Sequence, residues 1–173
     1  MMKYFRWDMN KFIMKFAIAA FFITGCAVVP LDGPGADKKA KKFSPPANMS
    51  YLYILRDSIG VPLEIVEING KTIGGLSNET FFLLELKPDV YKVRIGVKAA
   101  FDSEAKGNIT GWLTLGTASV DLLTKPGHMY FIRVEMPLTK GQASAILTIL
   151  PIDEGKEYVL NFKRAKILNK LLQ

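Results

Sequence analysis

The residues able to perform acid–base or nucleophilic chemistry are few in this chain of 173 residues, which holds one histidine. His128 follows a Pro-Gly turn and precedes an expected strand. A hydrolytic histidine needs a nucleophile and an orienting carboxylate. Ser119 with Asp121, or Ser144, are the available candidates, and none lies in a G-x-S-x-G elbow. We therefore interpret His128 as a turn residue and expect no catalytic residues.

Residues that could bind a metal ion or a cofactor are also few. The carboxylate pairs Asp153-Glu154 and Asp102-Ser-Glu104 could bind a hard cation loosely, but neither has the ligand density of a calcium loop. One histidine cannot build a histidine-based metal cluster, and one cysteine cannot form an internal disulfide. We predict no metal and no cofactor, and a protein that is not an enzyme.

The single cysteine, Cys26, follows a segment with the parts of a secretory signal. Four basic residues up to Lys15 precede an apolar run from Phe16 to Ile23, and the small residues Thr24 and Gly25 come next. The run is too short for a spanning helix, which needs about 20 apolar residues. A buried structural cysteine is the alternative, because free cysteines are often buried.

Ile23-Thr24-Gly25-Cys26 resembles the lipobox of bacterial lipoproteins. This resemblance implies cleavage between Gly25 and Cys26 and transfer of a diacylglycerol to the Cys26 thiol, so that residues 1–25 are a lipoprotein signal peptide. It also implies a sorting rule, under which Asp after the cysteine retains a lipoprotein at the inner membrane. Ala27 stands there, so we expect a palmitate-bearing protein at the outer membrane that faces the periplasm.

Residues 26–48 have the composition of a flexible tether. They contain four prolines, two glycines and the cluster Lys38-Lys39-Ala40-Lys41-Lys42. These lysines could rest on anionic head groups, or could simply keep the tether soluble. The net charge is +7, but no basic track is interleaved with exposed aromatic residues, so we expect no nucleic-acid partner.

From Met49 onward the sequence predicts strands. Leu63–Ile68 runs into Asn69-Gly70, a strong hairpin signal, and Tyr91–Val97 alternates apolar and polar residues. Further strands are expected at Tyr51–Arg56, Thr80–Leu86, Trp112–Leu123, Tyr130–Met136 and Ala143–Ile152. Such spacing without intervening helices favours a small antiparallel β-sandwich over residues 49–152. Residues 153–173 then predict a C-terminal helix packed on or beside it.

The turn motifs of this domain are similar to those of a known family. Tyr51–Arg56, Ile68–Gly74, Leu86–Tyr91 and Lys125–Phe131 resemble the DUF2846 domain, and the middle part is similar to PEGA-type hairpins. Asp89 stands where the family usually has Gly, and His128-Met129-Tyr130 replaces its usual Gly-Lys-Tyr. The resemblance implies a small β-sandwich of bacterial envelope lipoproteins and carries over no catalytic residue.

Two functions follow as hypotheses. The first is a membrane-anchored envelope lipoprotein whose non-catalytic β-sandwich docks a periplasmic or envelope protein. The alternative is a small-ligand or glycan-binding module, which would use exposed aromatic residues such as Tyr51, Tyr53, Tyr91 and Tyr130. Strand aromatics are more often core residues or cross-strand pairs.

Overall fold

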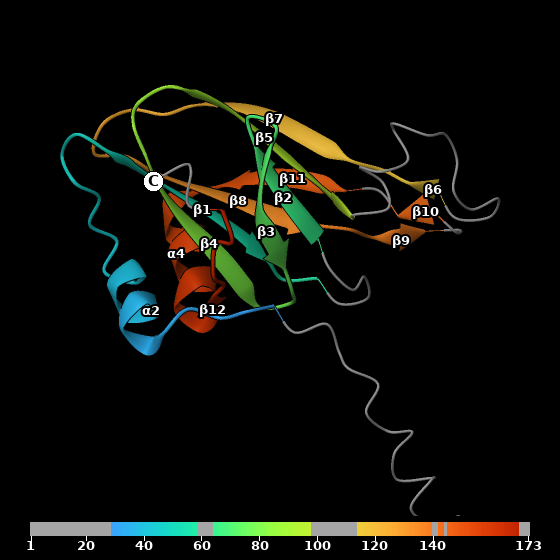
Figure 1. Ribbon diagram of the computed structural model, residues 1–173, viewed down its shortest axis with the longest axis horizontal. Helices are drawn as coiled ribbons and strands as arrows, with labels where there is room; N and C mark the ends of the chain where they lie inside the picture. Colours follow the sequence, from blue (N-terminus) through green and yellow to red (C-terminus); the bar gives the residue numbers. More distant parts are fainter. Residues whose placement is uncertain (1–28, 59–63, 98–113, 140–141, 144, 170–173) are drawn as a thin grey trace, which may run out of the picture.

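The computed structural model describes residues 29–58, 64–97, 114–139, 142–143 and 145–169. Two β-sheets pack face to face, and two helices cover the outer surface of one of them (Figure 1). This arrangement confirms the mainly β sandwich with a helix near its C-terminus.

The larger sheet is built around β1, a strand with two buried faces. A strand of this kind requires an apolar run rather than an alternation, and Tyr51-Leu52-Tyr53-Ile54-Leu55 is such a run. The strands of this sheet, in spatial order, are β11 (Ile146–Leu150), β8 (Met129–Glu135), β1 (Ser50–Arg56), β4 (Thr80–Leu86) and β12 (Lys163–Arg164).

The second sheet is wholly antiparallel and contains the predicted hairpin. Asn69 and Gly70 both have positive φ angles, 49° and 75°, as the tight hairpin turn of type I′ requires. The spatial order is β3 (Lys71–Leu76), β2 (Glu64–Ile68), β5 (Val90–Val97) and β7 (Ala118–Leu123). A small third sheet comprises β6 (Thr114–Leu115), β10 (Gln142–Ala143) and β9 (Leu138–Thr139).

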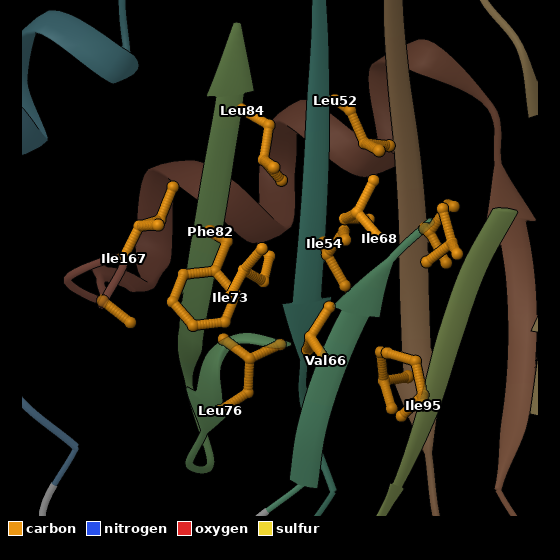
Figure 2. Packing of buried hydrophobic residues seen from close by; sticks show 14 of the residues in the cluster. Leu52, Ile54, Val66, Ile68, Ile73, Leu76, Phe82, Leu84, Ile95 and Ile167 are labelled. Carbon is orange, nitrogen blue, oxygen red and sulfur yellow. The ribbon is translucent and has the colours of Figure 1, made fainter. Parts of the chain in front are cut away.

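The main core lies between the two large sheets. Figure 2 shows Leu52, Ile54 and Phe82 of the larger sheet against Val66 and Ile95 of the second sheet. Each of these five side chains is fully buried. The side chains of β5 therefore alternate as predicted, with Val93 and Ile95 buried in this core and Lys92 exposed.

A second core lies on the other face of the larger sheet, beneath α2 (Pro34–Ala40) and α4 (Ile152–Asn161). The rings of Tyr53 and Phe131 stack there with centroids 4.7 Å apart. Val159 of α4 and Ala40 of α2 are both buried in this cluster. The larger sheet is thus apolar on both faces, because it packs against the second sheet on one side and the helices on the other.

The strand pairing is mostly antiparallel, but three of the described pairs are parallel: β1 with β8, β12 with β4, and β10 with β6 in the small third sheet. The β1–β8 pair follows from how the chain crosses between the sheets. After β7 the chain enters the larger sheet at the end where β1 begins, and Gly127 N donates a hydrogen bond of 2.7 Å to Met49 O. β8 therefore runs in the same direction as β1.

The C-terminal helix is present, but its bounds differ from the predicted 153–173. α4 ends at Asn161, and Phe162 adopts an extended conformation. The chain then lies along β4, where Ala165 N donates to Phe81 O at 2.8 Å. Ala165 and Ile167 are buried while Lys166 and Leu168 are exposed, a period of two that belongs to a strand. Residues 170–173 lie outside the described residues.

Val93→Asp should unfold the domain, because it places an unpaired carboxylate between the sheets. Such burial costs several kcal/mol, and the whole stability of a domain is about 5–15 kcal/mol. Arg94→Gln is the matched control, since Arg94 points outward to an ion pair with Glu67 at 3.6 Å. It should cost at most about 1 kcal/mol. Circular dichroism melts would measure both, and equal losses would contradict the register.

Gly155→Ala should destabilise the domain although alanine favours helices by about 1 kcal/mol. A Cβ atom at Gly155 would overlap the ring of Phe131, which is itself stacked on Tyr53. Overpacking of this kind costs about 1–3 kcal/mol.

Gly35→Ala in α2 is the control, because its added Cβ meets nothing within 4 Å. It should be neutral or stabilising by up to about 1 kcal/mol. Urea unfolding of the two variants would compare them, and a stabilising Gly155→Ala would contradict the close approach of α4 to β8.

Candidate membrane-attachment site

Gly25 and Cys26, the predicted cleavage and lipidation residues, lie outside the described residues, as does the whole predicted signal peptide 1–25. Val29, the first described residue, is only 4% exposed and belongs to the core between the sheets. Only Ala27 and Val28 separate Cys26 from this buried residue. The predicted attachment residue is therefore close, along the chain, to the folded core.

Residues 30–32 form an extended segment that pairs with the C-terminal part of the chain. Lys166 N donates to Pro30 O at 2.8 Å, and Asp32 N donates to Arg164 O at 2.9 Å. Leu31 and Ala165 form an antiparallel bridge between them. The side chains add an ion pair, with Arg164 Nε 3.2 Å from Asp32 Oδ2.

Part of the predicted flexible tether at 26–48 is ordered, because α2 occupies residues 34–40 and both Val29 and Ala40 are buried. Pro34 stands in the first turn, where its missing N–H costs nothing. Asp37 and Lys41, four residues apart, form an ion pair of 2.9 Å. These local signals were present in the sequence, but proline, glycine and lysine are equally typical of linkers.

Hydrogen bonds hold α2 and the residue that follows it against the rest of the domain. Asp37 Oδ1 accepts a 2.9 Å hydrogen bond from Arg164 N, and Lys41 Nζ donates to Phe162 O at 2.7 Å. The hydroxyl of Tyr53 donates to Ala40 O at 2.8 Å. Burial raises the pKa of the Tyr53 hydroxyl, so this donor stays protonated throughout the physiological range.

We call residues 29–42 and 163–168 the attachment face. It contains seven basic and two acidic residues. Both acids, Asp32 and Asp37, are in ion pairs within the face. The side chains of Lys38, Lys42, Lys163 and Lys166 are exposed, so the surface of this face is basic.

The residues proposed as catalytic candidates are spread over different elements. His128 lies in the turn before β8, where its Nδ1 is 2.8 Å from Pro126 O, as a turn residue should be. Ser119 and Asp121 are exposed on the outer face of β7, and Ser144 lies outside the described residues. His128 therefore lies on a different element from Ser119 and Asp121.

The acidic pair Asp153-Glu154, considered above as a loose cation site, has a structural role in α4. Asp153 and Glu154 stand in the first turn of α4, where a negative charge favours the helix dipole, and Glu154 lies 3.6 Å from Arg133. The pair Asp102 and Glu104 lies outside the described residues. Within the described part of the chain, no three His, Cys, Asp or Glu side chains are grouped to hold a metal ion.

The tyrosines proposed as an aromatic surface are core residues to differing degrees. Tyr51 and Tyr53 are buried beneath the helices, and burial also raises the pKa of Tyr51. Tyr91 and Tyr130 are partly buried against the main core. They give the glycan-binding alternative no exposed aromatic platform.

Comparison with protein-family models and with curated proteins finds no match for this chain. The resemblance to the DUF2846 domain therefore stays a prediction. Among the helices that the structure describes, none is both long and apolar enough to cross a membrane.

A chain that begins at Pro46 should be much less stable than one that begins at Ala27, contrary to what a flexible tether would imply. Removing residues 27–45 strips Val29 and Ala40 from the two cores and leaves the buried Tyr53 hydroxyl unpaired, which alone costs about 1–3 kcal/mol.

Thermal melts of the two chains would measure the difference. Tyr53→Phe in the longer chain is the control for the lost hydrogen bond and should cost about 1 kcal/mol. Equal melting temperatures for the chains starting at 27 and 46 would show that α2 contributes nothing to stability.

Proposed function

We propose that this chain is a bacterial envelope lipoprotein, held in the membrane through an acylated Cys26, whose β-sandwich is a non-catalytic module that docks a periplasmic or envelope protein. The lipobox-like run Ile23-Thr24-Gly25-Cys26 after a basic and apolar segment carries this proposal. The placement of the motif supports it, because Val29, three residues later, is the first described residue and is buried in the core. Cleavage before Cys26 would therefore retain every residue that the structure describes.

The proposed anchor is energetically sufficient. Each buried CH₂ of an acyl chain contributes about 0.8 kcal/mol, and two or more chains make attachment stable where one does not. The thioether needs a thiol, and Cys26 is the only cysteine in the chain. No other residue can therefore replace it as the acceptor.

The docking role is supported by the different outer surfaces of the two sheets. The larger sheet is covered by α2 and α4 (Figure 1), whereas neither of these helices packs on the outer face of the second sheet, where Lys92 and Asp121 are exposed. Of the reactive side chains described above, His128 lies in a turn, Asp153 and Glu154 lie in the first turn of α4, and Ser119 and Asp121 lie on β7. The exposed polar face of the second sheet offers a surface on which a partner protein could dock.

Cys26→Ala should abolish lipid attachment and leave an uncleaved or mislocalised precursor, because the processing needs the thiol. Metabolic labelling with a palmitate analogue measures this directly. Ser119→Ala is the control, since Ser119 is an exposed residue of β7 far along the chain from the motif. Equal labelling of Cys26→Ala and the unaltered protein would contradict the proposal.

A further inference from the structure

We infer that the attachment face rests directly on the head groups of an anionic bilayer, so that the domain has one fixed orientation on the membrane. This inference rests on the proposed lipidation of Cys26. It goes further, because a lipoprotein on a long tether would have no preferred face toward its membrane.

The first support is the length of chain between the lipid and the fold. The three steps from Cys26 to Val29 span roughly 10 Å when fully extended. A bilayer's head-group layer takes about 5–7 Å of this on each side of the hydrocarbon core. Val29 is buried and paired into the domain by its neighbour Pro30. The domain surface around Val29 is therefore pressed against the head groups.

The second support is the charge distribution, which is independent of the chain length. The attachment face carries seven basic against two acidic residues, and the rest of the chain after residue 25 carries twelve against thirteen. The rest of the chain after residue 25 is nearly neutral, so the excess of positive charge lies on the attachment face. Anionic head groups attract such clusters of lysine.

The positive side chains are also the ones that protrude. Lys38 is exposed on α2 and Lys42 is exposed just after this helix ends, while Lys163 and Lys166 are exposed on the C-terminal segment. Leu31, beside them, leaves 45% of its surface exposed. An apolar side chain among lysines is suited to the boundary between head groups and acyl chains.

The side of the sandwich away from the attachment face should point away from the membrane. Leu168 N of the attachment face donates to Ile73 O of β3, and β7 is the opposite edge strand of the same sheet. Asp121 of β7 is exposed, and so is Lys125 in the turn before β8. These two positions are the reference points for a test of orientation.

The test uses the acylated protein in vesicles of phosphatidylethanolamine and phosphatidylglycerol. The thioether consumes the only natural thiol, so a cysteine introduced by Leu31→Cys, Lys163→Cys, Asp121→Cys or Lys125→Cys is the sole site for a nitroxide label. Paramagnetic resonance then measures the access of a water-soluble nickel complex to each label. We expect access at positions 31 and 163 to fall about threefold or more between detergent and vesicles, because the head groups cover these positions. Access at positions 121 and 125 should not change.

Charge-reversal variants distinguish the contribution of the exposed lysines from the contribution of the short link between Cys26 and Val29. Lys38→Glu with Lys42→Glu should restore part of the access at position 31, whereas the matched pair Lys92→Glu with Lys125→Glu, both at exposed positions outside the attachment face, should not. All four labels equally accessible in vesicles, on protein shown by mass spectrometry to be acylated, would overturn the inference while leaving the lipoprotein proposal standing. Equal effects of the two charge reversals would overturn the role of the lysines. A chain without an acyl group would overturn the proposed function and this inference with it.

Discussion

The backbone pairing of residues 163–168 is the interaction on which the arrangement of the domain depends. Lys163 N and Ala165 N donate to Glu79 O and Phe81 O along β4. On its other side this segment pairs with Pro30–Asp32, and at its end Leu168 N donates to Ile73 O of β3 at 2.9 Å. One short extended segment therefore joins the first described residues to the edges of both sheets.

The contact with β3 is possible because of an irregularity in that strand. The register between β2 and β3 shifts after Val66, so that Ile73 is an extra residue in the ladder. Gly74 follows with a φ of 150°, and a Cβ there would lie 2.9 Å from the ring of Phe82. The bulge bends β3 toward the larger sheet, and glycine lets Phe82 fill the space between them. The sandwich is closed at this edge as a result.

Local patterns predicted the strands well, and long-range pairing explains what they missed. The alternation around Val93 and Ile95 predicts a strand, and Asn69-Gly70 predicts a hairpin turn. Each of these signals lies within a few residues of the chain. The place of residues 29–32 depends instead on Arg164, more than a hundred residues away. No composition rule separates a Pro-Gly-Lys linker from a segment that finds such a partner. The predicted Cys26 site came wholly from a local motif, whereas the basic face required the fold to join its two segments.

In the proposed membrane-bound arrangement, the short link from Cys26 to Val29 and the closed sheet edge together limit how a partner would reach the domain. Because residues 30–32 are held by both main-chain pairing and the Asp32–Arg164 ion pair, this link would lengthen only if part of the sheet edge opened. Such an opening would also cost the contacts that α2 makes to Tyr53 and Arg164. With the edge closed, the proposed docking surface would be the outer side of the second sheet, away from the attachment face. The hydrogen bonds that close the edge would then set both the distance to the membrane and the surface offered to a partner.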